Sequence, residues 1–377
     1  MKILFLRSNP VDPDSRVEKE VEALADVGHT VEIFAWDRRR YHDFELDQLS
    51  LGAHRIPVTR VGVESKYSAG FKKNLVPLAA FEASLSSFLK CELWRFDVVH
   101  ACDFDTAYVA SKWCRRLHKL LVYDIFDYYV DSFSVPGVLK GFVEGMDRRL
   151  IDCADATIIC TERRAEQIAG ASPQRLTVVH NSPGVPNWLA SFEGPTTSER
   201  VRICYVGVLS KGRDISGLLD FVASNEGFEL HIGGFGLYEN DVCQYAERCG
   251  NIFFYGKVSY AETLRLEASC DILVAMYDPS IRNHFFAAPN KFYEGLMLGK
   301  PLVMARGSGM SDIVEQERLG FVCEYGDVGS GLINARERRS EWEAISDCER
   351  HLYRSRYSWN VMKKRLVHLY DELEKSL

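Results

Sequence analysis

The sequence has no C-x-x-C pair, and its number of cysteines is odd. It also has no apolar run of about 18 residues that could span a membrane. Its 377 residues include 11 cysteines, and several, such as Cys160, Cys204 and Cys323, lie inside apolar segments. Structural zinc sites need closely spaced thiols and small secreted proteins need paired ones, so this pattern argues against both. We therefore expect a protein of a reducing, cytoplasmic compartment.

Positive charge is also in short supply. The net charge of -7 and the pI near 5.9 give no general attraction to nucleic acid, so no nucleic-acid partner is expected. The start, MKILFLRSNP, is too short an apolar run for a signal peptide. Local clusters at Lys72-Lys73 and at Arg115-Arg116 with Lys119 are expected to be solvated faces, with contact to an anionic membrane surface as the alternative. Any membrane contact would be peripheral, at the inner face of the membrane.

Short apolar runs alternate with amphipathic segments along the whole chain. In the first half the runs are KILFLRS, TVEIFAW, DVVHA, LLVYDI, ATIIC and LTVVH, and they are rich in β-branched residues, as are strands buried on both faces of a parallel sheet. A stretch rich in proline and glycine, NSPGVPNWLASFEGPTTSER, interrupts the pattern before it restarts at RICYVG. No internal repeat is evident.

This organisation predicts an α/β protein with two doubly wound, Rossmann-like domains that face a cleft. We place the first at 1–183 and the second at 184–355. A terminal helix over 356–377 is expected to cross back to the first domain. Its apolar stripe comprises Trp359, Met362, Leu366, Leu369, Tyr370 and Leu373.

A short predicted helix, in APNKFYEGLMLGKP, carries a lysine where the helix dipole disfavours one. Pro289 stands at its start, Gly299 follows its end, and Lys291 lies in its first turn, where an anion would be welcome. Glu294 lies three residues later, on the same face and about 4.5 Å along the axis. A diphosphate near Lys291 would leave an attached ribose within reach of Glu294. The alternative is a surface ion pair between the two residues, worth tenths of a kcal/mol.

Two further loops follow predicted strands, where ligands bind in open α/β sheets. The strand RICYVG ends at Gly207, and the loop behind it places Lys211 and Arg213 before a helix N-terminus, a setting that favours phosphate. The turn GGFG includes Gly234, which would let the backbone approach a ligand closely, although such turns are more often structural. Val258, after the next strand, is a positional candidate for base recognition.

The segments PNKFYEGLMLGKPLV, CDILVAMYDPS and VGVLSKGRDISGLLDFV together resemble the donor-binding half of glycosyltransferase family four, which has the GT-B fold. DVVHACDFDT, LLVYDIFDYY, VVHNSP and YSWNVMKKRL are similar to other family motifs, so the resemblance spans nearly the whole chain. It implies a retaining transfer of a sugar from a nucleotide-diphosphate donor to an acceptor hydroxyl, with no required metal or other cofactor. In this resemblance Glu294 holds the ribose, and Arg213 and Lys291 neutralise the diphosphate.

Three positions depart from the family pattern. Phe286 replaces the usual first glutamate, so contacts to the sugar hydroxyls are expected from Asn283, His284 or Asn290. Phe126 stands where the family has a histidine that faces the transferred sugar, and this puts the identity of the sugar in question. Val208 replaces a second arginine, which places more of the charge stabilisation on Arg213 and Lys291.

The acceptor side is predicted at strand ends of the first half. Asp127 or Asp103 could accept the proton of the acceptor hydroxyl, or each could simply cap a helix. His100 and Asp124 are expected to contact the acceptor, and Arg16 an anionic acceptor group. The Asp103-Phe104-Asp105 sequence has the form of a metal-binding D-x-D, but no phosphate-binding loop accompanies it.

The function predicted from these motifs is a glycosyltransferase that builds a surface polysaccharide or glycolipid, with a nucleotide sugar and a glycan or lipid-linked acceptor as partners. A sugar-nucleotide epimerase can share the same architecture, and transfer to an acceptor would distinguish the two. The substitutions at Phe126 and Phe286 leave a third possibility, a catalytically silent protein that binds nucleotide sugars.

Overall fold

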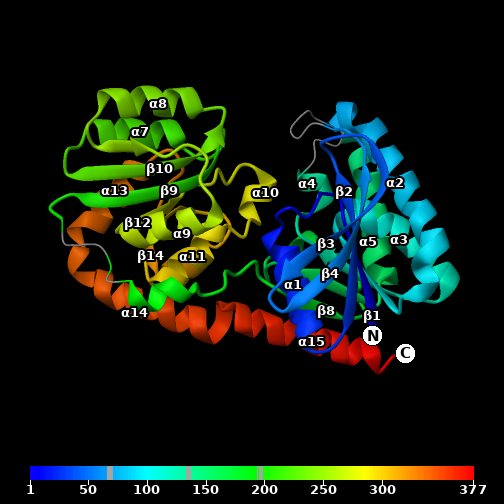
Figure 1. Cartoon of the computed structure of the whole chain (residues 1–377). Helices are drawn as coiled ribbons and strands as arrows, with labels where there is room; N and C mark the ends of the chain where they lie inside the picture. Colours follow the sequence, from blue (N-terminus) through cyan, green and yellow to red (C-terminus); the bar gives the residue numbers. More distant parts are fainter. Residues whose placement is uncertain (66–70, 133–136, 193, 195–197) are drawn as a thin grey trace. The chain divides into compact units, whose positions relative to one another are not determined.

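The computed structural model describes residues 1–65, 71–132, 137–192, 194 and 198–377 (Figure 1). The chain forms two compact units: Met1–His180 together with Met362–Leu377, and Asn181–Val361. The boundary expected at 183/184 falls in the connecting segment just after this division. Both units are built from parallel strands and covering helices, so the predicted α/β class is confirmed.

The first unit contains an eight-stranded sheet in the order β3-β4-β2-β1-β5-β6-β7-β8. Every neighbouring pair is parallel except β3 and β4, which form an antiparallel hairpin at one edge. The elements are β1 (Lys2–Arg7), α1 (Ser15–Asp26), β2 (Thr30–Asp37), β3 (His42–Leu51), β4 (His54–Gly62), α2 (Phe71–Glu92), η1 (Leu93–Arg95), β5 (Val98–Cys102), α3 (Asp103–Leu117), β6 (Leu120–Ile125), α4 (Tyr129–Ser132), α5 (Gly137–Cys153), β7 (Ala156–Ile159), α6 (Arg164–Gln167) and β8 (Leu176–Val178).

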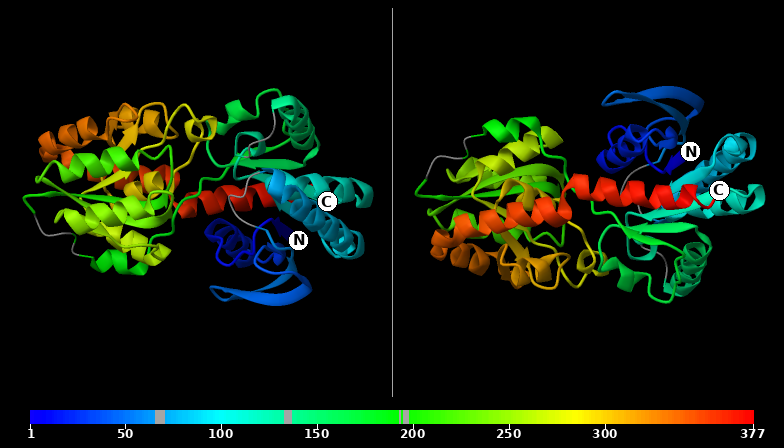
Figure 2. Two further views of the ribbon diagram at one scale, coloured as in Figure 1. Left: turned by 90° about the horizontal axis from the view of Figure 1, so that it is seen from above. Right: turned by 90° about the horizontal axis from the view of Figure 1, so that it is seen from below.

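Strands β5 and β7 of this sheet are buried along their whole length. All five residues of β5 are buried, as are all four of β7, because helices cover both faces of the sheet (Figures 1 and 2). One apolar core joins strand residues such as Leu4 and Phe34 to residues of α2, α3 and α5, among them Phe81 and Ala107. The continuous apolar runs of the sequence therefore correspond to the strands that they predicted.

The second unit contains six parallel strands in the order β11-β10-β9-β12-β13-β14. Its elements are η2 (Asn187–Ser191), β9 (Val201–Leu209), α7 (Ile215–Ala223), β10 (Phe228–Gly236), α8 (Glu239–Arg248), β11 (Ile252–Phe254), α9 (Tyr260–Ser269), β12 (Ile272–Ala275), α10 (Arg282–Phe285), α11 (Asn290–Leu298), β13 (Leu302–Ala305), α12 (Ser311–Gln316), β14 (Gly320–Cys323), α13 (Val328–Glu337), η3 (Arg339–Glu341), α14 (Trp342–Leu352) and a π-helical turn, η4 (Tyr353–Tyr357).

The strand order reverses direction between β9 and β12, the first strand of the unit and the fourth. Chain connections leave these two neighbours in opposite directions, so their carboxyl ends frame a crevice, and this is where doubly wound sheets bind ligands. In the first sheet the corresponding place is between β1 and β5. Functional residues are therefore expected at these two positions.

The last helix, α15 (Trp359–Glu374), supplies Met362–Leu377 to the first unit. It buries Met362, Leu366, Leu369, Tyr370 and Leu373, which are five of the six residues in the predicted stripe. Tyr370 reaches the core of the unit, where its hydroxyl lies 2.8 Å from His100 Nδ1. The helical stripe of the sequence is thus an interface with the first unit's own sheet.

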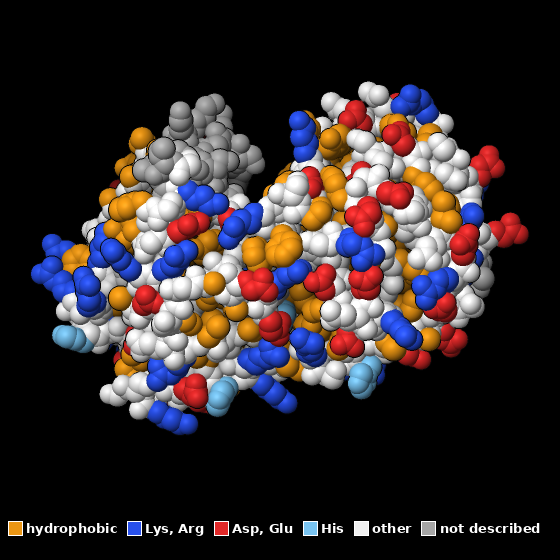
Figure 3. All heavy atoms as spheres, turned by 180° about the vertical axis from the view of Figure 1, so that it is seen from behind, with side chains coloured by type: hydrophobic (Ala, Val, Ile, Leu, Met, Phe, Trp, Pro, Cys, Tyr) orange, Lys and Arg blue, Asp and Glu red, His pale blue; other side chains and the backbone are white. Residues whose placement is uncertain are grey.

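No helix among the described residues is long and apolar enough to cross a membrane. Figure 3 shows basic and acidic side chains interspersed over one face, with hydrophobic side chains between them. The side chains of Lys72 and Lys73, which the sequence marked as a basic cluster, lie outside the described part of the structure.

Candidate active site

Beside the switch point, two glycines lie opposite each other towards the carboxyl ends of β9 and β10. Gly234 pairs with Gly207 in register and has a φ of +140°. A Cβ atom at residue 234 would lie 1.8 Å from the Gly207 carbonyl oxygen, so no other residue fits there without movement of the backbone. The glycine-rich segment, predicted as a turn, therefore forms the end of β10 and allows its backbone to lie close to β9.

Lys291 lies at the beginning of α11 and is directed towards the end of β9. Its Nζ donates to the carbonyl oxygen of Val206 and lies 4.6 Å from the centre of the Tyr205 ring. Only 8% of the residue is exposed. Burial alone would lower the pKa of Lys291, but nearby acidic groups, led by Tyr205, outweigh it and hold the pKa above its usual value. The side chain is therefore a buried, charged ammonium group.

Arg213 supplies a second cation from the loop after β9. Its guanidinium carbon lies 3.4 Å from the centre of the Tyr277 ring, just beyond β12, a stacking contact that fixes the plane of the group. The Nη1 atom is buried and has no hydrogen-bond acceptor. Neither Arg213 nor Lys291 forms an ion pair with a described residue, so both retain the capacity to bind an anion.

Glu294 follows Lys291 by three residues on α11 and is 3% exposed. It lies against Glu267 of α9, and burial together with the charge of Glu294 raises the pKa of Glu267 well above its usual value. Burial and these two carboxyl groups also raise the pKa of Tyr260, at the start of α9. The two carboxyl groups therefore resist being ionised together, and the oxygens of Glu294 can accept hydrogen bonds from hydroxyl groups.

The remaining donor candidates surround this group with unequal exposure. Asn290 is exposed, and its Oδ1 accepts a hydrogen bond from Asn181 Nδ2 at 3.1 Å. Val258 is half-buried beside the β10 turn, where its Cγ2 lies 3.4 Å from the Cβ position of residue 233. Phe286 is buried and packs edge to face on Phe285, with 4.9 Å between ring centres. The position of the family's first glutamate is thus an apolar one in this chain.

Two neighbours of Phe286 carry polar atoms without a partner. Asn283 Oδ1 and His284 Nδ1 are buried and have no hydrogen-bond partner. Burial and the charge of Arg213 lower the pKa of His284, so its imidazole is neutral. Both side chains were expected to replace the missing glutamate, and both have hydrogen-bonding atoms left for that purpose.

The crevice of the first unit is closed by ion pairs. Arg7, the last residue of β1, donates from Nη1 to Asp103 Oδ2 at 2.5 Å and from Nε to Asp14 Oδ2 at 2.9 Å. Asp103 Oδ1 accepts from the backbone N–H groups of Phe126 and Asp127 at 3.0 and 3.2 Å. Burial raises the pKa of Asp103 to about 6, although Arg7 opposes this shift. Asp103 thus ties together the ends of β1, β5 and β6 and caps neither neighbouring helix.

Phe126 lies between two guanidinium groups. The guanidinium carbons of Arg7 and Arg16 are 4.3 and 4.4 Å from the centre of its ring. Next to it, Asp127 is the more accessible carboxylate, with 56% of its side chain exposed, and its Oδ1 accepts from Arg164 Nη2 at 3.0 Å. Asp127 can meet a ligand from solvent, whereas Asp103 is already committed to partners within the unit.

The three residues assigned to the acceptor form a buried cluster instead. His100 and Asp124 are completely buried and Arg16 is 5% exposed. Arg16 Nη2 donates to Asp124 Oδ1 at 2.9 Å, and His100 Nε2 lies 3.3 Å from Asp124 Oδ2. Residues at strand ends were expected to face a ligand, but here they face α1 and α15. The expectation of acceptor contacts at these positions does not fit their burial.

One group of possible metal ligands occurs among the described residues: His100, Cys102 and Asp124, with ligand atoms within 4.8 Å of one another. Arg16 already neutralises Asp124, and burial raises the pKa of the Cys102 thiol, which opposes the thiolate that a metal would need. The D-x-D sequence offers no better site, because Asp103 binds Arg7 and the Asp105 carboxylate accepts from the Thr106 backbone. These residues do not fit a resident ion.

Sequence reasoning missed several residues of both crevices. Tyr205, Tyr277 and Glu267 surround the predicted donor residues, and Arg7 and Arg164 hold the predicted aspartates. Arg7 and Tyr277 each end or follow an apolar strand run, a signal that could have been used. Glu267 lies inside a helix and gave no such signal.

Two Rossmann-like units in one chain are the architecture of the GT-B class of glycosyltransferase. Residues 13–182 match the family model described as "Glycosyl transferase 4-like domain", and residues 200–338 match "Glycosyl transferases group 1". The chain is therefore a glycosyltransferase that resembles family four, as the motifs predicted. No curated protein sequence matches it.

Solved structures agree on the fold. Sucrose-phosphate synthase from Thermosynechococcus elongatus has 14% identity and a TM-score of 0.78, with 100% of both chains covered. HepE from Anabaena, in complex with UDP, has 16% identity and a TM-score of 0.69, with 99% of this chain and 100% of that one covered. An Escherichia coli protein titled trehalose-6-phosphate and bound to UDP-2-fluoro glucose has 10% identity and a TM-score of 0.70, with 98% of each chain covered. At these identities the likeness concerns the fold alone.

Proposed function

We propose that this glycosyltransferase moves a sugar from a nucleotide-diphosphate donor to an acceptor hydroxyl with retention of configuration and without a metal ion. The observation that carries the proposal is the pair of cations at the switch point of the second unit. Lys291 is buried and charged, and Arg213 has a buried Nη1 without an acceptor. A diphosphate supplies the anion that this pair lacks.

The same pair accounts for rate enhancement. When the sugar leaves, negative charge grows on the diphosphate, and cations that are already in place stabilise that charge more than they stabilise the bound donor. Arg213 is fixed on Tyr277 and Lys291 on the end of β9, so little reorganisation is needed as the charge develops. Val208 contributes no charge here, so these two side chains carry this role.

The adjoining ribose is assigned to Glu294 and the transferred sugar to Asn283, His284 and Asn290. Glu294 can accept hydrogen bonds from both ribose hydroxyls through its two carboxyl oxygens. The unpartnered Asn283 Oδ1 and His284 Nδ1 offer hydrogen bonds to sugar hydroxyls. Support for a uridine donor comes from relatives in fold, whose solved complexes contain UDP or UDP-glucose.

On the acceptor side we assign the proton-accepting role to Asp127, the exposed carboxylate beside Phe126. Asp103 positions that loop by holding the Phe126 and Asp127 backbone N–H groups. Arg16, His100 and Asp124 stabilise the unit from within. A glycan or lipid-linked acceptor at the inner face of the membrane, in surface polysaccharide or glycolipid synthesis, remains our proposal for the pathway.

The proposal is tested with a thermal-shift panel of UDP-, GDP-, ADP-, dTDP- and CDP-sugars. A ligand at about 100 times its Kd stabilises the folded state by about 2.7 kcal/mol, so at least one donor should raise the melting temperature clearly. That donor should then be hydrolysed or transferred, and Arg213→Ala and Glu294→Ala should abolish both the shift and the turnover. Interconversion of the free donor would instead indicate an epimerase, and binding without turnover a silent protein.

A further inference from the structure

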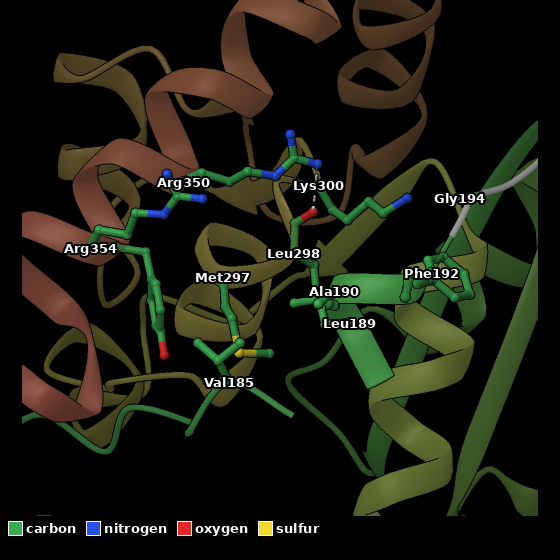
Figure 4. Close-up of a pocket in the computed structure, with 12 residues that line it drawn as sticks. Val185, Leu189, Ala190, Phe192, Gly194, Met297, Leu298, Lys300, Arg350 and Arg354 are labelled. Carbon is green, nitrogen blue, oxygen red and sulfur yellow. Dashed lines mark hydrogen bonds between the residues drawn. The ribbon is translucent and has the colours of Figure 1, made fainter. Parts of the chain in front are cut away.

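A second pocket lies in the same unit but shares none of the assigned donor residues (Figure 4). It has a volume of about 530 Å³, within the roughly 300–1,000 Å³ range of small-molecule sites. Four parts of the unit line it: the connecting segment at η2, the end of α9, the carboxyl end of α11 with Lys300 beyond it, and α14 with the turn η4 that follows it. This location is at the opposite end of α11 from Lys291.

The walls of the pocket are of two kinds. Apolar side chains come mainly from the connecting segment and α11, and three cationic side chains come from the residues beyond α11 and from α14 with η4. Figure 4 shows the cations along one side and the apolar groups along the other. The apolar set is Val185, Leu189, Ala190, Phe192, Ala268, Met297 and Leu298, with the ring of Tyr353, and the cationic set is Lys300, Arg350 and Arg354.

The cations are only partly used by the protein. Lys300 Nζ donates to the Cys270 carbonyl at 2.7 Å, and Arg350 Nη2 donates to the Leu298 carbonyl at 3.3 Å. These bonds cap helix ends, but an ammonium group has three donors and a guanidinium five, so most donors remain. The Arg354 side chain forms no hydrogen bond or ion pair with any described residue. Helix capping therefore explains two of the cations incompletely and the third not at all.

Among the residues that the structure describes, no carboxylate lines the pocket. Glu349, next to Arg350, is fully buried and both its oxygens lack a hydrogen-bond partner. Burial raises its pKa well above the usual range, although the charges of Arg350 and Lys300 oppose this shift, so its ionised form is disfavoured. Asp347 is 79% exposed, and its Oδ1 is 4.0 Å from Arg350 Nη1, a weak surface contact. Burial, with the like charge of Arg350 contributing, lowers the pKa of Lys300 to about 8. An anion in the pocket would relieve that cost.

We propose that this pocket is a second ligand site, one that takes an amphiphilic anion: a phosphate or carboxylate carried on an apolar body. A bare inorganic anion would leave the wall of Val185, Leu189 and Met297 without a partner, and a neutral apolar molecule would leave the cations unpaired. The combination of the two walls selects a molecule with both properties. The inference is independent of the proposed donor site.

The test uses dodecyl phosphate below its critical micelle concentration, with binding to the full chain measured by isothermal titration calorimetry. We expect one molecule per chain, no displacement by saturating UDP, and no binding of the neutral dodecyl maltoside. Arg354→Glu should weaken binding at least 10-fold. The matched control is Arg248→Glu, which makes the same charge change on α8 of the same unit and should leave the affinity unchanged.

A second variant addresses the apolar wall without disturbing the core. Val185 is 61% exposed, so Val185→Asp should fold normally, with an unchanged melting temperature, and should weaken dodecyl phosphate at least 10-fold. The proposal fails if neither variant changes the affinity, if UDP displaces the probe, or if inorganic phosphate binds as tightly as dodecyl phosphate. It also fails if the monomeric probe does not bind and only vesicles containing phosphatidylglycerol do, since that result indicates adsorption to a surface.

Discussion

The two units place arginine or lysine at the same point of their sheets but treat the charge differently. In the first unit Arg7 and Arg16 bind aspartates at 2.5 to 2.9 Å, so each charge is neutralised within the fold. In the second unit Arg213 and Lys291 have ring and carbonyl contacts but no ion pair with a described residue. The first arrangement stabilises a structure, and the second leaves positive charge for a ligand. A shared topology therefore marks where a site can be, and charge balance indicates which crevice is one.

The largest effect should come from breaking the first unit's network. Arg16→Ala leaves Asp124 buried without its cation, and we expect the free energy of unfolding to fall by about 3–5 kcal/mol, measured by urea denaturation. Arg306→Ala is the control, because its ion pairs with Glu315 and Glu324 are exposed and should contribute less than about 1 kcal/mol. A loss below about 1 kcal/mol for Arg16→Ala would mean that the network does not stabilise this unit.

The second unit should show the reverse behaviour. Arg213→Ala removes a charge that has no internal partner, so we expect kcat/KM to drop by about 10²–10³ with little change in stability. Lys211→Ala, an exposed cation of the same loop, is the matched control and should retain most activity. Equal losses in the two variants would show that general positive charge, and not the position of Arg213, is what matters.

A smaller effect is expected at the floor of the second crevice. Gly234→Ala places a Cβ against the Gly207 carbonyl and should cost about 1–3 kcal/mol of stability, together with weaker donor binding. Gly250→Ala provides the comparison, since an added Cβ there meets nothing within 4 Å. Both variants are measured by chemical denaturation and donor titration. Similar stabilities for the two would contradict the close approach of the strands.

The smallest expected effect is a pH dependence that differs between the two units. Burial raises the pKa of Asp103 to about 6, so this carboxyl takes up a proton as pH falls through 6 and loses its hold on Arg7 and the Asp127 loop. We expect turnover to decline below pH 6 while donor affinity, set in the second unit, stays constant. Both are followed from pH 5 to 8.

Unfolding cannot mimic this pH profile through Asp103. The pKa of Asp103 is higher in the folded protein than its reference value of 3.8, so between these values the folded state binds the proton that the unfolded state has released. Its contribution to stability therefore rises as pH falls. The side chain introduced by Asp103→Asn does not titrate, so turnover of this variant should not decline as the pH falls through 6. If the decline persists, another group causes it.

Local signals allowed much of the fold to be predicted. The helix Asn290–Leu298 lies between a proline and a glycine, and Gly299 has the left-handed φ of +67° that ends it. Apolar runs gave the buried strands in the same way. The β3–β4 hairpin was missed because β3 is exposed over most of its length and shows no apolar face, and α2 because its apolar residues are spread round the helix and Pro77 interrupts it.

Contacts between distant segments could not be predicted in this way. The sequence predicted that Arg213, Lys291 and Glu294 belong to one site. It could not show that Arg213 stacks on Tyr277 or that Glu294 lies against Glu267. It also placed His100 and Asp124 on a ligand-facing edge, whereas Tyr370, which binds His100, lies 270 residues further along the chain. A strand end indicates position but not what covers it.

Most of α15 belongs to the first unit although it lies at the end of the chain, and this limits how the chain can be divided or recombined. A fragment that stops at His180 would lose Tyr370, which lies against His100, and Glu374, which pairs with Met1. It would also lose the five apolar side chains that α15 buries. Exchange of the first unit between related chains therefore requires α15 to be exchanged with it, because the unit is built from both ends of the chain. A chimaera with a single junction would combine the sheet of one protein with the α15 helix of another.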